Sequence, residues 1–153
     1  MLLVLAVMGL VAMLVVPRLD AAVPAYRLRA AARQIASTIT WARSESIVRG
    51  ISLGVRYDFE AGTYRVVERP PAGTSPGAGA AGQGRLPGGR LPDGVSFAGI
   101  SYAGGASAKR GAATVYFSFL GACGAHSIHL ADKDGNRFTI EVLALGAQVN
   151  LYE

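Results

Sequence analysis

The sequence predicts an α+β domain in which one long N-terminal helix packs on antiparallel β-sheet. Three observations lead to this prediction. The chain opens with an apolar run, it continues with hydrophobic residues at helical spacing, and from Ile51 onward the hydrophobic period changes to two. Because the chain has 153 residues, it can form one domain in addition to the apolar run.

The first element is the apolar run, residues 1–16, which carries no charged or polar side chain. As a helix it would rise about 24 Å, slightly less than the bilayer core of about 30 Å. A cleaved signal peptide needs a basic start, whereas the first basic residue here is Arg18. A helix buried in a protein core is another alternative. We favour a membrane segment that extends upstream, and the residues expected to contact lipid or partner helices are Leu2, Leu3, Leu5, Val7, Leu10, Val11, Leu14, Val15 and Pro17.

The second element continues the helix as an amphipathic segment. Pro17 and Pro24 are expected to kink it, because each lacks a backbone N–H. The helix should end at Arg49, because Gly50 suits the position after a helix. The apolar stripe comprises Leu28, Ala32, Ile35, Ile39 and Ala42, and off it lie Arg29, Arg33, Gln34, Thr40 and Arg43.

The remaining elements are short strands. Residues 51–57 and 63–68 form a predicted hairpin around a turn at residues 58–62. Residues 70–92 are rich in Gly, Ala and Pro and predict a mobile surface loop. Further strands are predicted at residues 95–102, 114–119, 126–131, 137–145 and 148–152, with a glycine-rich loop at 103–111. Val115, Phe117 and Phe119 are expected to face the core, and the strand order stays open.

No pattern in the sequence predicts catalysis, a metal site or a cofactor. His126 and His129 should point to opposite faces of a strand, which disfavours a shared metal. The segment from Asp132 to Asn136 resembles the start of a calcium loop, but a hairpin turn explains it better because the distant glutamate is missing. Cys123, the one cysteine, cannot form an intramolecular disulfide and is interpreted as a small core residue.

The charge pattern bears on partners and topology. The net charge of +5 comes from scattered arginines and does not by itself imply nucleic-acid binding. The positive-inside rule would place Arg18, Arg27 and Arg29 in the cytoplasm. A membrane-anchored protein outside any filament is a further alternative.

The N-terminal segment MLLVLAVMGLVAMLVVPRL resembles the first helix of type IV pilins and type II secretion pseudopilins. In that family an apolar run follows Phe-Thr-Leu-Ile-Glu and ends at a proline, the position that Pro17 would occupy. The leader, the prepilin cleavage site and the N-terminal phenylalanine are not within residues 1–153. Either these features lie upstream of Met1, or the protein is not processed as the family is. The resemblance implies that the arginines after the run lie outside the cytoplasm.

Residues 33–67 resemble the GspH and FimT family, in which a helix ending in a W-A-R-S-E-A-I-x-R-G pattern enters a strand and a D-x-x-x-G turn. The matching residues are Trp41, Ala42, Arg43, Ser44, Glu45, Ile47, Arg49 and Gly50. The resemblance implies a pilin-like fold with residues 1–17 as transmembrane and assembly helix and residues 18–153 as periplasmic head.

In function, the resemblance implies a non-enzymatic minor pseudopilin of the type II secretion system, without a cofactor. Its expected location is the bacterial inner membrane, crossed once, with the C-terminal domain in the periplasm. Its expected partners are other pseudopilins or pilins and the secretion or pilus machinery, in a hetero-oligomeric filament. The alternative is a FimT-like minor type IV pilin that primes pili or binds DNA. Nucleic acid is disfavoured, because residues 146–149, where such pilins carry arginines, contain none.

Overall fold

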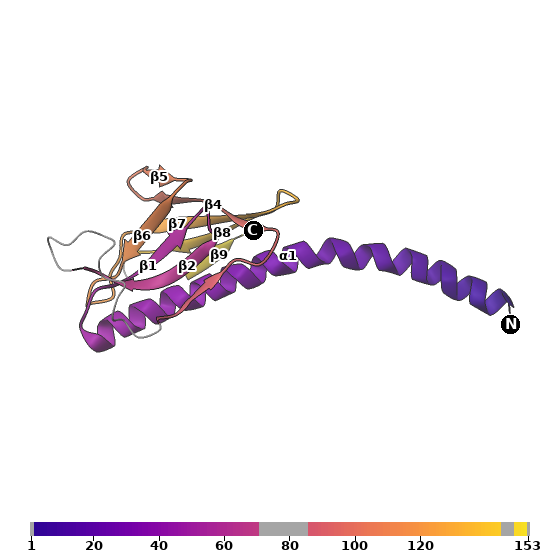
Figure 1. The fold of residues 1–153 in the computed structure, drawn as a ribbon, viewed down its shortest axis with the longest axis horizontal. Coiled ribbons are helices and arrows are strands. Elements are labelled where there is room, and N and C mark those ends of the chain that lie inside the picture. The colour runs from indigo at the N-terminus through magenta and orange to yellow at the C-terminus, as the bar shows by residue number, and fades with distance from the viewer. Residues whose placement is uncertain (1, 71–85, 145–148, 153) are drawn as a thin grey trace.

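A computed structural model describes residues 2–70, 86–144 and 149–152, with side chains from Ala25 onward apart from that of Leu151. One helix, α1 (Leu2–Arg49), confirms the predicted helix bounds. It continues through Pro17 and Pro24, and its N-terminal half curves away from the strands (Figure 1). Where side chains are described, no helical stretch is long and apolar enough to cross a membrane.

Among the described residues, nine strands form two antiparallel sheets, and their order could not be predicted from the sequence. Sheet A has the order β3-β2-β1-β6, and sheet B has the order β5-β4-β7-β8-β9. The strands of sheet A are β1 (Leu53–Asp58), β2 (Thr63–Glu68), β3 (Gly88–Arg90) and β6 (Ala112–Tyr116). Those of sheet B are β4 (Val95–Tyr102), β5 (Ser107–Ala108), β7 (His126–Asp132), β8 (Arg137–Val142) and β9 (Val149–Tyr152).

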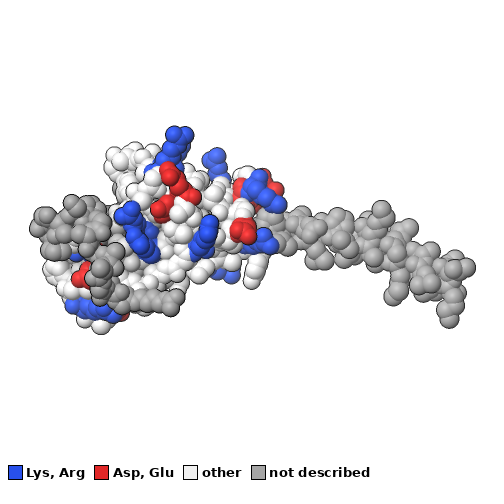
Figure 2. Space-filling view, viewed as in Figure 1, with Lys and Arg blue, Asp and Glu red and all other residues white. Residues whose placement is uncertain are grey.

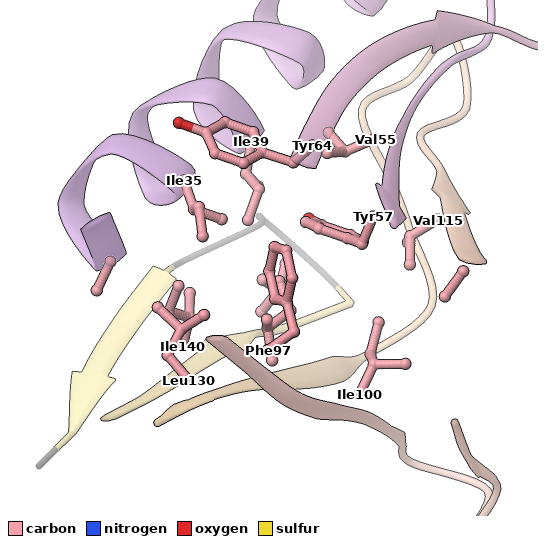
Figure 3. Packing of buried hydrophobic residues seen from close by; sticks show 14 of the residues in the cluster. Ile35, Ile39, Val55, Tyr57, Tyr64, Phe97, Ile100, Val115, Leu130 and Ile140 are labelled. Atoms are coloured by element: carbon pink, nitrogen blue, oxygen red, sulfur yellow. The ribbon is translucent and has the colours of Figure 1, made fainter. Parts of the chain in front are cut away.

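The core lies where the helix meets the inner faces of both sheets. The five stripe residues predicted to be apolar contacts are all buried, which confirms the helical period. Ile35 and Ile39 project into the space between Tyr57 of sheet A and Leu130 of sheet B (Figure 3). The ring of Phe97 on β4 packs edge-on against Tyr57, with 5.9 Å between ring centroids, and so joins the two sheets.

Two predictions about loops need correction. Within the stretch predicted as a loop at residues 70–92, residues 88–90 form β3 and Leu91 is buried, while residues 71–85 lie outside the described chain. Glycine allows this pairing, because a Cβ at Gly88 would lie 2.7 Å from the carbonyl oxygen of Tyr64. The loop predicted at 103–111 likewise contains the two-residue strand β5.

The strand predicted at residues 114–119 is displaced toward the N-terminus. Val115 and Phe117 are buried as predicted, but Phe119 is 57% exposed, so its predicted core position is wrong. The chain turns after Phe117, because the Ser118 N–H donates to the Ala122 carbonyl at 2.8 Å and the Gly121 N–H donates to the Ser118 carbonyl at 2.8 Å.

Candidate assembly site

The end of α1 is closed by backbone hydrogen bonds. The Ile51 N–H donates to the Ser46 carbonyl at 3.2 Å, and the Gly50 N–H donates to the Ile47 carbonyl at 3.3 Å. This pair of bonds is the Schellman arrangement, in which the residue after the helix adopts positive φ. Gly50 has a φ of 65°, which explains the glycine that ends the sequence motif.

Two polar residues of the last helical turns bind the loop at residues 118–121. The Arg43 Nε–H donates to the Gly121 carbonyl at 3.2 Å. The Ser46 hydroxyl lies 2.6 Å from the Arg43 carbonyl and 3.2 Å from the Ser118 carbonyl. Since Ser46 is fully buried, these carbonyls satisfy a hydroxyl that would otherwise be costly to bury.

The other motif residues divide between the core and the surface. Trp41 packs against the core cluster, and Ala42 belongs to it. Glu45 and Arg49 form an ion pair one helical turn apart, and Ser44 is exposed. Most of the motif therefore builds the helix end and the loop on it, which is a structural role that the sequence did not reveal.

Exposed apolar side chains of the helix end and of this loop are named here the helix-end patch. It consists of Ile47, Phe119 and Leu120, with exposed fractions of 47%, 57% and 74%. Ile47 contacts the loop, because a Cβ built on Gly121 would lie 2.6 Å from its Cδ1. Ile47 belongs to the last turn of α1, which ends at Arg49. Ser46, Phe119 and Leu120 were missed as site residues, because nothing in their spacing predicts that residues 118–121 fold onto the helix.

Replacing Gly121 with alanine should weaken the contact between helix and loop. Gly121 has a φ of 77°, and an added Cβ would also lie 3.1 Å from Arg43 Nε. Gly105→Ala is the matched control, because Gly105 has a φ of 82° but nothing within 4 Å. We expect Gly121→Ala to lower the free energy of unfolding by about 1 kcal/mol more than Gly105→Ala, since Ile47 must leave its rotamer. Urea unfolding of the full chain in nonionic detergent, followed by Trp41 fluorescence, measures both, and equal losses would contradict the contact.

The N-terminal residues predicted for membrane contact lie outside the described side chains. This holds for Leu2, Leu3, Leu5, Val7, Leu10, Val11, Leu14, Val15 and Pro17. Their role stays a prediction.

The polar residues considered for chemistry have structural roles. His126 is buried, whereas His129 on the other face of β7 lies 3.1 Å from the hydroxyls of Ser101 and Thr139. The Asp132 carboxylate accepts bonds from Asn136 and the Asp134 N–H, which hold the predicted hairpin turn and lower the pKa of Asp132. Over the described parts of the chain, no three His, Cys, Asp or Glu residues could hold a metal ion.

Two buried polar atoms, Tyr57 Oη and His126 Nε2, have no hydrogen-bond partner among the described residues. Burial raises the pKa of Tyr57 and lowers the pKa of His126, because each charged form would lose its hydration. Cys123 is half-buried against the core, which raises the pKa of its thiol. In each of the three groups burial favours the uncharged form.

The stability of the fold should therefore fall as the pH drops below about 6.5, the usual histidine pKa. The unfolded chain binds a proton at His126 before the folded chain does, because burial lowers the folded pKa. We expect the urea concentration at the unfolding midpoint to decrease as the pH is lowered from 8 to 6. This interval lies above the range in which carboxylates titrate. His126→Asn should reduce this dependence and His129→Asn should keep it. A midpoint that is constant over this range in the unmodified chain would contradict the prediction.

The chain resembles one protein family and several solved structures. The family model described as "Type II transport protein GspH" matches residues 31–146. Two structures of the minor pseudopilin EpsH from the type II secretion system of Vibrio cholerae are similar, with TM-scores of 0.61 and 0.63 and identities of 12% and 11%. They match 82% of this chain and 94% and 95% of theirs.

The type IV minor pilin FimU of Pseudomonas aeruginosa (strain PAO1) is also similar in structure, with a TM-score of 0.55 and 12% identity. The match covers 82% of this chain and 88% of FimU. At these identities the structures show a shared pilin-like fold. No curated protein matches the chain.

Proposed function

Because the chain belongs to the GspH family of type II transport proteins, we propose that it is a non-enzymatic minor pseudopilin of a type II secretion system. The observation that carries the proposal is the family match over residues 31–146, which spans the C-terminal part of α1 and the strands from β1 to β8. The fold shared with EpsH supports it, since EpsH is a minor pseudopilin of such a system.

In this proposal residues 1–17 anchor the protein in the inner membrane and residues 18–153 form a head in the periplasm. The uncharged run of residues 1–16 suits storage in lipid and later packing against helices of neighbouring subunits. The projecting half of α1 supports this role, because it leaves the strands and is free to contact other subunits (Figure 1). The partners would be other pseudopilins in a hetero-oligomeric filament.

A minor type IV pilin is the second candidate, and the likeness to FimU favours it. DNA binding through the C-terminal region is disfavoured. The terminal strand β9 (Val149–Tyr152) carries no basic residue, and phosphate contacts depend on lysine or arginine.

Deleting the gene in its own bacterium separates the two candidates. A pseudopilin predicts that exported proteins accumulate in the periplasm while surface pili and twitching motility persist. A minor pilin predicts the reverse. Complementation with the Leu10→Asp variant should fail, because an acidic side chain in the middle of a membrane helix is costly, whereas Arg33→Gln on the exposed face of the helix should complement. Secretion that is normal without the gene would refute the proposal.

A further inference from the structure

A polar groove on the outer face of sheet A is not used by the proposed helix packing. It has a volume of about 200 Å³ and is lined by Arg56, Asp58, Thr63 and Arg65. Arg56 of β1 lies directly opposite Arg65 of β2, so the two arginines share one face of the sheet. Arg90 of β3 lies opposite Thr63 and extends the cationic face.

The charges in the groove are unbalanced. Like charges directly opposite each other destabilise a sheet, and no ion pair joins either arginine to an acidic residue among the described residues. Asp58 is the one carboxylate among the described residues that line the groove, and its Oδ1 accepts the Ala61 N–H of the turn at 2.9 Å. Basic side chains lie over the face where β1 and β2 are seen in Figure 1 (Figure 2). Two arginines therefore face one carboxylate in the groove, so a second carboxylate would balance the charge.

We propose that this groove, with Arg56 and Arg65 as its paired donors, docks an aspartate or glutamate side chain of another protein. A guanidinium binds a carboxylate with two parallel hydrogen bonds, and two guanidinium groups on adjacent strands can hold one carboxylate between them. The small volume suits a single side chain.

The geometry is less suited to nucleic acid. Binding of single strands needs aromatic rings on which bases stack, and Tyr116 is the aromatic residue among the described outward positions of sheet A. Arg69 lies over its ring at 5.4 Å from the centroid. A Cβ at Gly54 would lie 2.6 Å from Tyr116 Cδ1, so the ring also rests on the β1 backbone. The ring is therefore already in contact with Arg69 and with the β1 backbone.

The test uses the full chain in nonionic detergent and a fluorescein-labelled peptide of alternating glutamate and glycine. The alternating glutamine and glycine peptide and a labelled oligothymidylate are the comparison probes. We expect the glutamate peptide to bind more weakly as salt increases and the glutamine peptide not to bind. Arg65→Glu should weaken binding about tenfold, since it reverses one charge of an exposed contact. Lys133→Glu is the matched control in the exposed turn of sheet B and should change binding less than about twofold.

The Asp58→Asn variant gives a second test, because peptide affinity would not change if the groove residues had only a structural role. It removes the competing charge and keeps an oxygen for the Ala61 N–H, so peptide affinity should rise about threefold. Equal losses in Arg65→Glu and Lys133→Glu would overturn the proposal, because only net charge would then matter. Oligothymidylate that binds more tightly than the peptide and depends on Arg65 would overturn it in favour of nucleic acid. The peptide assay tests only the groove and the secretion assay tests only the proposed function, so a negative result in one leaves the other proposal unaffected.

Discussion

Replacing Ile39 with alanine should lower the free energy of unfolding by about 2–5 kcal/mol, the range for truncating a buried aliphatic side chain. Ile39 is fully buried on the helix stripe and projects between the two sheets (Figure 3). The substitution removes apolar contacts and leaves a cavity that three packed elements cannot easily fill. Urea unfolding of the full chain in nonionic detergent measures the loss. The chain contains one tryptophan, Trp41, which packs against the same core and reports on it by fluorescence.

Thr40→Ala is the matched control for Ile39→Ala. Thr40 follows Ile39 in the helix but is exposed, and its hydroxyl donates to the Ala36 carbonyl at 3.0 Å. We expect a change within about 0.5 kcal/mol, as is usual for surface positions. A similar loss in both variants would mean that helix propensity, and not burial against the sheets, governs stability.

Replacing Gly54 with alanine should destabilise the centre of sheet A by about 1–3 kcal/mol, the usual cost of overpacking. Gly54 pairs with Val67 of β2 and with Tyr116 of β6. An added Cβ would lie 2.6 Å from Tyr116 Cδ1 and 2.8 Å from the Val115 carbonyl oxygen. The ring can rotate, but the carbonyl belongs to the strand backbone, so relief requires β6 to move away from β1.

Gly124→Ala is the control for Gly54→Ala. Gly124 lies outside the sheets, has no atom within 4 Å of a built Cβ and does not have a left-handed φ. Its replacement should leave stability unchanged or raise it by up to about 1 kcal/mol, since alanine restricts the unfolded chain. Near-ultraviolet circular dichroism and urea unfolding of both variants make the comparison. An unchanged midpoint for Gly54→Ala would show that β6 does not lie as close to β1 as the structure places it.

The local elements of the fold could be predicted because their signals lie close together in the chain. The stripe from Leu28 to Ala42 repeats every helical turn, and all its members are buried. Gly50 and Gly62 end the helix and turn the hairpin with φ values of 65° and 62°. The resemblance of residues 33–67 to the GspH and FimT family also agrees with the family match.

The predictions failed where the outcome depends on distant residues. Phe119 alternates correctly with Val115 and Phe117, yet it is exposed, because Ser118 binds Ala122 and turns the chain. Residues 88–90 looked like part of a glycine-rich loop, yet they pair with β2, because Gly88 and Gly89 have no side chains and can approach Tyr64 closely. Neither contact has a periodic pattern in the sequence.

The sequence by itself determined the long helix, its buried stripe, the hairpin after it and the family, since each depends on neighbours within a few residues. Only the tertiary structure decided the two-sheet order, the packing of residues 118–121 on the helix end and the arginine pair of β1 and β2. Arg56 and Arg65 are nine positions apart in sequence and become neighbours through the strand register. Register and sheet order follow from the combined burial of many side chains, and no short segment of the sequence contains that information.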